Sequence, residues 1–408
     1  MKRLKKLDVL TYHKDYYNSI SVGLFIKFGS KNETEEDSGI SHFIEHMLFR
    51  TNKKNRNSKI IVEELGGYVN AYTTKEYICI HGKILSNYQE ILINTILDIV
   101  LYPCFSETDI KLEKQVVLNE LWNYENNEEI QCQNKLMNTM LESHPLSRTI
   151  LGTKNNIKNF EQNYLQLKHI DILKRNKVLS IAGNIDSDKI NNILEQRINE
   201  FPDSDNSQIY SIEKINNYKQ INLKRQNNRN VNTISHAFPG IEYSNKKIML
   251  YNILTNILGY HSSSILNQKL REDKGLVYNV NCLSYSFEEG GIVLISCSTH
   301  KPENIAVITD ILYREYDRIL EKGISLESFN MMKEVLKTQI LFNSENPSNI
   351  MFDRGKSFLL NISGYKDINY ECSENLKSDI DLLKYSDLNK ILTNIFSNEV
   401  STISSVSV

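Results

Sequence analysis

Hydrophobic and polar positions alternate near the start of the chain and recur at helical spacing further on. Between positions 20 and 28 every second residue is apolar, and this period of two predicts a strand with one buried face. The apolar positions are Ile20, Val22, Leu24, Ile26 and Phe28. Further on, the pattern predicts helices over residues 59–65 and 91–102, strands over 68–72 and 76–82, and a Gly-Gly turn at positions 66 and 67.

The second half of the chain repeats this order of elements. The pattern predicts a strand over 230–238, helices over 246–258 and 263–272, strands over 278–286 and 291–298, and a helix over 302–320. Gly-Gly-Tyr-Val-Asn of the first half and Gly-Leu-Val-Tyr-Asn of the second occupy equivalent places. We therefore predict a duplicated α+β fold, with two homologous domains that are each a mostly antiparallel sheet covered by helices. The polar segment PDSDNS (202–207) favours a boundary between residues 1–204 and 205–408.

Charge and hydropathy exclude several classes of protein. The 408 residues carry a formal net charge of −2, so no basic excess is available to neutralise the phosphates of nucleic acids or anionic membranes. The start of the chain, MKRLKKLDVLTYHKDYY, contains no apolar run of the kind found in secretory signals. The most apolar predicted helix, residues 91–102, is short and contains Asp98, so we expect a core helix and no membrane span.

The cysteines favour a cytoplasmic protein. They are scattered along the chain and form no Cys-x-x-Cys pair, which indicates buried thiols in a reducing compartment and not a disulfide framework or a second zinc site. The six positions are Cys79, Cys104, Cys132, Cys282, Cys297 and Cys372.

The stretch His42-Phe43-Ile44-Glu45-His46 places two imidazoles and a carboxylate on one side of a helix. At about 100° per residue, His46 lies about 40° round from His42, and Glu45 about 60° to its other side. Two neutral imidazoles one turn apart can bind one zinc ion, and a carboxylate between them can reach a metal-bound water. The order His-x-x-Glu-His is the inverse of the commoner His-Glu-x-x-His zinc-protease motif. The second half lacks such a motif, since its corresponding segment contains His261 alone.

A zinc protease site needs a third protein ligand, and a second predicted helix supplies one. Residues 106–127 have helical periodicity, and Ser106 with Asp109 forms a capping box at their start. Glu113 and Glu120 are seven residues apart, two helical turns, so they project from one face. We expect Glu120 to be the third zinc ligand. We expect Glu113 to lie behind the ligands, where it would orient a ligating histidine.

These motifs and others in both halves resemble the pitrilysin family, which includes insulin-degrading enzyme and mitochondrial processing peptidase. The segment GISHFIEHMLF is similar to the zinc helix of this family almost residue for residue, and LREDKGLVY resembles its second-domain signature. The resemblance rests on residues 21–30, 39–49, 67–73, 144–146, 150–153 and 270–278. The chain looks like a small, two-domain bacterial-type member.

The resemblance implies a zinc metalloendopeptidase that cleaves short or unstructured peptides in an enclosed chamber. His42, His46 and Glu120 would hold one Zn²⁺ per chain, and Glu45 would be the catalytic base. In the family, the strand that matches Asn70 and Ala71 pairs with the extended substrate, which requires little sequence specificity.

The second domain would supply Arg271 and Tyr278. In the family, the matching residues bind the peptide and help to polarise the scissile carbonyl, which suits the negative charge that develops on its oxygen. Larger family members have four homologous domains that close a chamber, so two chains of this length would have to pair. Because this chain carries both the zinc motif and the Arg/Tyr pair, we expect a homodimer over a heterodimer with a related subunit.

Two alternatives remain open. The chain could be a dedicated leader peptidase that matures one ribosomally made peptide. It could also belong to another class, as a non-catalytic structural or partner subunit, like family relatives that became subunits of respiratory complexes. That fate usually erodes the zinc motif, and here His42, Glu45, His46 and Glu120 are all intact.

Overall fold

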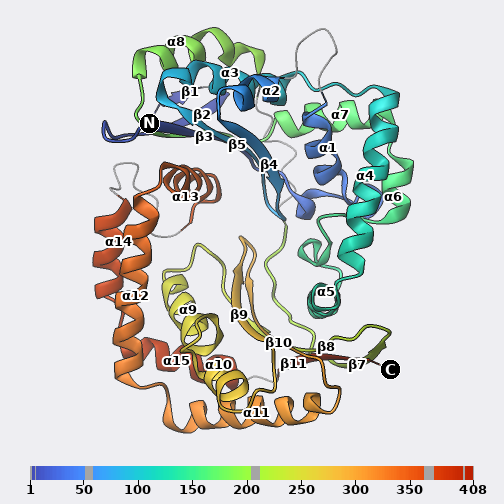
Figure 1. Ribbon diagram of the computed structural model, residues 1–408, viewed down its shortest axis with the longest axis vertical. Coiled ribbons are helices and arrows are strands. Elements are labelled where there is room, and N and C mark those ends of the chain that lie inside the picture. The colour runs from blue at the N-terminus through green and yellow to red at the C-terminus, as the bar shows by residue number, and fades with distance from the viewer. Residues whose placement is uncertain are drawn as a thin grey trace.

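Two β-sheets, one from each half of the chain, organise the fold (Figure 1). This computed structural model describes residues 2–4, 6–50, 58–203, 212–362, 372–397 and 400–407. The first sheet has the strand order β1-β2-β6-β3-β5-β4 and the second β7-β11-β8-β10-β9. The strands are β1 (Lys2–Leu4), β2 (Leu7–His13), β3 (Ser19–Ile26), β4 (Tyr68–Thr73), β5 (Ile78–Leu85), β6 (Lys177–Gly183), β7 (Asn222–Asn227), β8 (Asn232–Pro239), β9 (Asn279–Ser286), β10 (Gly291–Thr299) and β11 (Ser401–Ser407).

The two sheets share one topology. Leaving out β1, the order β2-β6-β3-β5-β4 corresponds strand for strand to β7-β11-β8-β10-β9. The pairing sense also corresponds, because β2 with β6 and β7 with β11 are parallel while the other neighbours are antiparallel. This repetition confirms the predicted α+β fold of two homologous, mostly antiparallel units. The predicted boundary between residues 204 and 205 lies outside the described residues.

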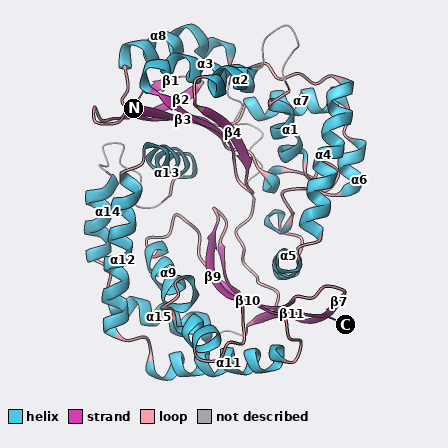
Figure 2. Ribbon diagram, in the orientation of Figure 1, coloured by secondary structure: helices cyan, strands magenta, loops and turns pink. Residues whose placement is uncertain are grey.

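Helices cover both sheets (Figure 2), and those that the pattern predicts begin and end close to the predicted positions. The remaining helices of both halves are not predicted. Those of the first half are α1 (Ile40–Leu48), α2 (Ser58–Glu64), α3 (Gln89–Leu101), α4 (Glu107–Glu125), α5 (Glu128–Leu141), α6 (Lys154–Asn159), α7 (Gln162–Leu173) and α8 (Ser187–Arg197). Those of the second half are α9 (Ile248–Thr255), α10 (Ile265–Asn267), α11 (Asn304–Lys322), α12 (Leu326–Ser344), α13 (Pro347–Leu360), α14 (Cys372–Asp381) and α15 (Tyr385–Phe396). The two predicted helices before β9 end in wider π-helical turns, Asn256–Tyr260 and Gln268–Glu272.

Strand β3 is buried on both faces, although its alternating pattern predicts one buried face. The predicted apolar positions belong to the core that the first sheet shares with α1 and α3. The other face packs against α13, where Ser21 Oγ lies 2.8 Å from Ser348 Oγ and Phe25 clusters with Met351. Gly355 permits this close approach, because a methyl group at that position would overlap the Phe25 ring. A helix from the second half of the chain therefore covers the first sheet.

The first half contributes a helix to the second sheet in return. Helix α5 follows α4 and packs on β8 and β11. Its buried Glu128 accepts a hydrogen bond from Ser405 Oγ at 2.6 Å and pairs with Arg229 at 2.5 Å. The next residue, Glu129, accepts a hydrogen bond from Asn281 Nδ2 at 3.2 Å. Helices α5 and α13 are thus exchanged, because each packs on the sheet of the other half. Figure 1 shows α4 and α12 running between the two halves toward these two helices.

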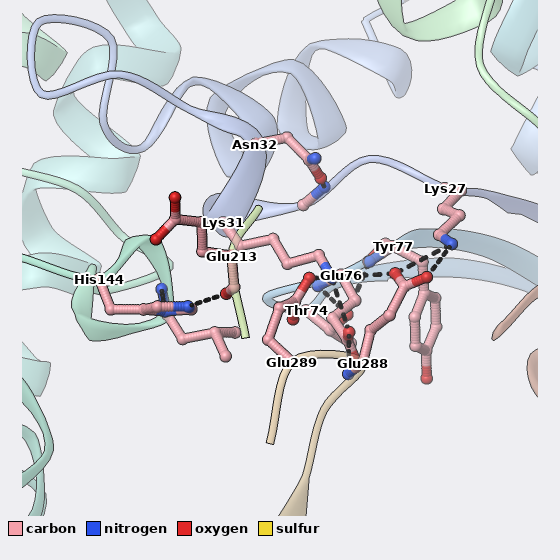
Figure 3. Close-up of polar contacts among 12 residues, drawn as sticks. Lys27, Lys31, Asn32, Thr74, Glu76, Tyr77, His144, Glu213, Glu288 and Glu289 are labelled. Atoms are coloured by element: carbon pink, nitrogen blue, oxygen red, sulfur yellow. Dashed lines mark hydrogen bonds and ion pairs between the residues drawn. The ribbon is translucent and has the colours of Figure 1, made fainter. Parts of the chain in front are cut away.

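A buried ion cluster joins the turns of the two sheets (Figure 3). The ammonium of Lys31, between β3 and α1, lies 2.9 Å from Glu76 in the β4–β5 turn. It also lies 2.7 Å from Glu289 and 3.3 Å from Glu288, both in the β9–β10 turn of the second half. The side chains of Lys31, Glu76 and Glu289 are 3%, 7% and 6% exposed, so this contact is shielded from water. It fixes the first half of the chain against the second.

The side chains of five of the six cysteines are described, while the side chain of Cys372 lies outside what the structure describes. The described thiols of Cys79, Cys132, Cys282 and Cys297 are buried, that of Cys104 is partly buried, and all five are free. Within the described ranges, every helix is too short or too polar to cross a membrane.

Candidate metal centre

Three side chains from two helices converge at one point. His42 and His46 project from α1 and Glu120 from α4, and Glu120 Oε2 lies 3.6 Å and 3.4 Å from the two Nε2 atoms. In a tetrahedral zinc site with bonds of about 2.0–2.1 Å, neighbouring ligand atoms are about 3.4 Å apart, which these distances match. Two imidazoles and one carboxylate also match the ligand set of catalytic zinc sites. Among the residues that the structure describes, this is the one His, Cys, Asp and Glu cluster able to hold a metal ion.

The start of α1 is held by contacts that fix the position of His42. Gly39 precedes the helix with φ +95°, a conformation that favours glycine. The buried carboxylate of Glu33 accepts hydrogen bonds from the backbone N–H of Gly39 at 2.7 Å and of Ser41 at 2.9 Å. Burial raises the pKa of Glu33 to about 7. Gly152 packs against Gly39 so closely that a Cβ on Gly39 would lie 2.8 Å from its Cα, so the loop at 144–153 buttresses the metal helix.

Helix α4 presents its two glutamates to α1. Ser106 caps the helix, since its Oγ accepts a hydrogen bond from the N–H of Asp109 at 3.1 Å, as the sequence predicts. Glu113 and Glu120 then face α1 from positions two turns apart, and Glu113 Oε1 lies 2.7 Å from His46 Nδ1. The structure thus brings together four of the predicted site residues.

Arg50 supports Glu113 from the other side. Its Nε donates to Glu113 Oε2 at 2.7 Å, while His46 Nδ1 contacts Oε1 of the same carboxylate. Because a carboxylate only accepts, Nδ1 of His46 carries a proton, which leaves Nε2 as the nitrogen that can bind a metal.

The electrostatics of the cluster favour a cation. Burial and the neighbouring His46 lower the pKa of His42. Burial also acts to lower the pKa of His46, but hydrogen bonds to Glu113 and Glu120 outweigh it and raise that pKa. The hydrogen bond to His46 likewise lowers the pKa of Glu120. The lowered pKa of His42 keeps its imidazole neutral and able to bind a metal, while the two carboxylates of α4 favour a positive charge at His46.

Glu45 lies beside the cluster without being one of its ligands. The residue is 9% exposed, and burial raises the pKa of its carboxyl group. Its Oε2 accepts a hydrogen bond from Thr73 Oγ1, on β4, at 2.5 Å. A buried carboxylate at this position is suited to exchange protons with a nearby water.

Sequence reasoning missed two of these residues, Arg50 and Thr73. Arg50 follows His46 by four residues, so continued helical spacing from His42 was an available signal. Thr73 follows Ala71 by two residues and therefore shares its face of the strand. Only the packing of β4 on α1 shows that this face meets Glu45.

Asn70 and Ala71 lie on β4, at the edge of the first sheet. Asn70 is exposed, and its Oδ1 accepts a hydrogen bond from the backbone N–H of Ala71 at 2.9 Å. This donor is therefore directed away from β5 and is protected by a side chain. A peptide added as a strand would accept the hydrogen bond of this backbone N–H in place of Asn70 Oδ1.

Arg271 and Tyr278 lie in the other half of the chain. The side chain of Arg271 is 53% exposed and its guanidinium is 3.8 Å from Glu272. Tyr278 precedes β9 and is 76% exposed. Figure 1 places α10 and β9 with the second sheet and α1 with the first. Among the described residues, no ion pair joins Arg271 to the metal cluster.

Comparisons of sequence agree with this geometry. The family model of the insulinases, peptidase family M16, matches residues 8–154, a range that includes the predicted ligands and Glu45. The model described as peptidase M16 inactive domain matches residues 172–336, the half that lacks the motif. The uncharacterized zinc protease YmxG of Bacillus subtilis is 30% identical over 345 residues, covering 84% of this chain and 83% of that protein.

Solved structures share the whole fold. A protease from Helicobacter pylori has a TM-score of 0.86 at 18% identity, over 98% of this chain and 97% of that one. A chain of Complex III2 from Candida albicans, Inz-5 bound, has a TM-score of 0.78 at 19% identity, over 97% of this chain and 93% of that one. At such identities the likeness establishes the fold alone.

Proposed function

The chain belongs to the insulinase family, peptidase family M16, and from this premise we propose that it is a zinc-dependent endopeptidase of short or unstructured peptides. One observation carries the proposal. Glu120 Oε2 lies at a spacing that suits zinc from Nε2 of both His42 and His46, with the buried carboxylate of Glu45 beside them.

Each residue of the site has a distinct role in this proposal. His42, His46 and Glu120 would hold one Zn²⁺ per chain, and the metal would lower the pKa of a water toward about 7. Glu45 accepts the proton of the attacking water and passes it to the leaving amine. Glu113 keeps the proton of His46 on Nδ1, so that Nε2 faces the site.

The substrate would bind as an added strand on β4. Asn70 and Ala71 are at the free edge of the sheet, where main-chain hydrogen bonds give affinity with little sequence demand. Arg271 and Tyr278 are exposed donors in the half that lacks the zinc motif. We propose that a second copy of the chain brings them opposite the zinc site, in a homodimer that encloses the peptide. They would stabilise the oxyanion that develops at the scissile carbonyl.

A non-catalytic subunit is the rival from another class. The Complex III2 likeness is one of fold and carries no activity to this chain. The convergence of all three predicted ligands and the presence of Glu45 favour catalysis. A dedicated leader peptidase would use the same site, and cleavage mapping against a set of unstructured peptides distinguishes a single preferred sequence from broad turnover.

The test is metal content together with peptide hydrolysis. Purified protein should contain about one zinc per chain, and Glu120→Ala should lose it. Glu45→Gln should keep the zinc and lose roughly 10²–10⁴-fold in kcat. Zinc-loaded wild type that cleaves none of the peptides, or undiminished turnover by Glu45→Gln, would overturn the proposal.

A further inference from the structure

The carboxylate of Glu45 is tied to the edge strand of the first sheet. Thr73 Oγ1 donates to Glu45 Oε2 at 2.5 Å, and the two residues come from different elements, β4 and α1. None of the roles assigned so far involves Thr73. This contact also lies on the strand that would receive the substrate.

The stereochemistry of β4 fixes where the hydroxyl points. Val69, Ala71 and Thr73 alternate along the strand and therefore share one face. Val69 belongs to the core of which α1 is part, and Ala71 packs against that core. Thr73 is consequently directed toward α1. A β-branched side chain is also restricted at χ1, so its hydroxyl occupies a defined position.

Glu45, by contrast, has a flexible side chain whose terminal torsion is broad. A donor that holds Oε2 orients the carboxylate plane and directs Oε1 elsewhere. Thr73 and Ala71 are two residues apart on the same strand, so the backbone that would pair with a peptide also carries the group that holds the base. This arrangement links the place of the substrate to the orientation of the base.

On the basis of the proposed function, we propose that Thr73 is a positioning residue, whose hydroxyl holds Oε2 of Glu45 so that Oε1 receives the proton of the attacking water. Thr73 touches neither the metal ligands nor the peptide in this role. Its contribution is realised through Glu45 and should therefore appear in kcat, with little change in KM.

Two substitutions separate the hydroxyl from the shape of the side chain. Thr73→Val has nearly the same shape but no donor, and it should lower kcat about tenfold or more with KM within about twofold, since small misplacements of reacting groups cost up to about 10²-fold. Thr73→Ser keeps the hydroxyl and should retain kcat within about threefold of wild type. Thr402→Val is the matched control, because Thr402 is a strand threonine of the second sheet whose hydroxyl donates to Asn222 Oδ1 at 3.2 Å. It should leave kcat unchanged.

A double variant tests whether the effect passes through Glu45. In the Glu45→Gln background no carboxylate remains to be oriented, so adding Thr73→Val should change the residual rate by less than about twofold. Zinc content and the unfolding midpoint are measured for every variant and should match wild type. The inference is overturned if Thr73→Val keeps full kcat or loses zinc, if Thr73→Ser is no better than Thr73→Val, or if the full loss recurs in Glu45→Gln. Zinc-loaded wild type without peptidase activity would instead overturn the proposed function itself.

Discussion

Nδ1 of His46 lies 2.7 Å from Oε1 of Glu113, while Nε2 of the same ring lies 3.4 Å from Oε2 of Glu120. The two glutamates of α4 thus contact opposite nitrogens of one imidazole. One nitrogen is held as a donor and the other is left to bind a metal. The seven-residue spacing of the glutamates therefore sets the tautomer of a predicted ligand as well as the ligand set itself.

Removing the carboxylate behind His46 should weaken metal binding without abolishing it. Glu113→Ala should lower zinc affinity about 10–100-fold, because the imidazole loses the partner that orients it. Arg50→Met should act in the same direction and more weakly. Competition with a chelator measures the affinity. Glu107→Gln, an exposed glutamate in the first turn of the same helix, serves as the control. Unchanged affinity in Glu113→Ala would refute the orienting role.

Mixing two inactive variants should restore peptidase activity if the site is completed across subunits. Glu45→Gln lacks the base, and Arg271→Ala/Tyr278→Ala lacks the donors of the second half. In a dimer that combines one chain of each variant, one of the two sites has Glu45, Arg271 and Tyr278 intact. Half of the dimers in a random equal mixture are of this kind, so the mixture should show about a quarter of the wild-type activity. Each variant alone is the control. Confirmed subunit exchange with no activity would rule out a site shared between two chains.

Lys31 should matter far more to stability than its neighbour Lys27. Lys31→Met leaves Glu76 and Glu289 buried without their cation, which should cost about 3–5 kcal/mol in the free energy of unfolding. Lys27→Met is the matched control. Lys27 and its partner Glu288 are 25% and 45% exposed, so this change should cost about 1 kcal/mol or less. Urea denaturation measures both. A Lys31→Met variant as stable as Lys27→Met would show that the cluster does not hold the two halves together.

The stability of the protein should fall as the pH drops below neutral, in part because of His236. This residue is fully buried on β8, where Nδ1 lies 3.1 Å from the Tyr316 hydroxyl, and burial lowers its pKa to about 3. Below pH 6.5 the unfolded chain binds a proton at His236 that the folded chain does not. Each pH unit between 6.5 and about 3 should therefore cost about 1.4 kcal/mol.

The variant His236→Gln isolates this contribution. It should reduce the slope of unfolding free energy against pH by about that amount, even if its stability at pH 7 is lower. Urea denaturation at pH 7, 6 and 5 provides the slope for both proteins. Equal slopes would mean that another group determines the acid sensitivity.

Local periodicity was enough to predict the duplicated fold but not its exchanged helices. The alternation in β3 and the spacing in α4 appear directly in the sequence, because each element buries one face against its own core. By contrast, β6 is buried throughout and its sequence lacks any alternation, so no strand is predicted there. Which sheet α13 covers depends on contacts between residues more than 300 positions apart, such as Ser21 with Ser348. Periodicity carries no such information.

The same distinction holds at the metal centre. His42, Glu45 and His46 share one helix, and Glu113 and Glu120 share another, so regular spacing predicts which side chains gather on each face. Thr73 reaches Glu45 only through the packing of a strand on a helix. In our proposal, Arg271 and Tyr278 reach the site only through a second copy of the chain. Beyond the two helices that the motifs mark, predictability therefore ends where a role requires two elements to meet.

The exchange of α5 and α13 also affects the order in which the protein can fold during synthesis. Strand β6 ends at Gly183, and α13, which covers it, begins at Pro347, 164 residues later (347 − 183). Ribosomes add about 5–20 residues per second, so α13 is made roughly ten to thirty seconds after the last strand of the first sheet. During that interval the face around Phe25 lacks its contacts with α13, such as the one with Met351. A nascent chain therefore carries the predicted metal ligands before the helix that covers the other face of the first sheet has been made.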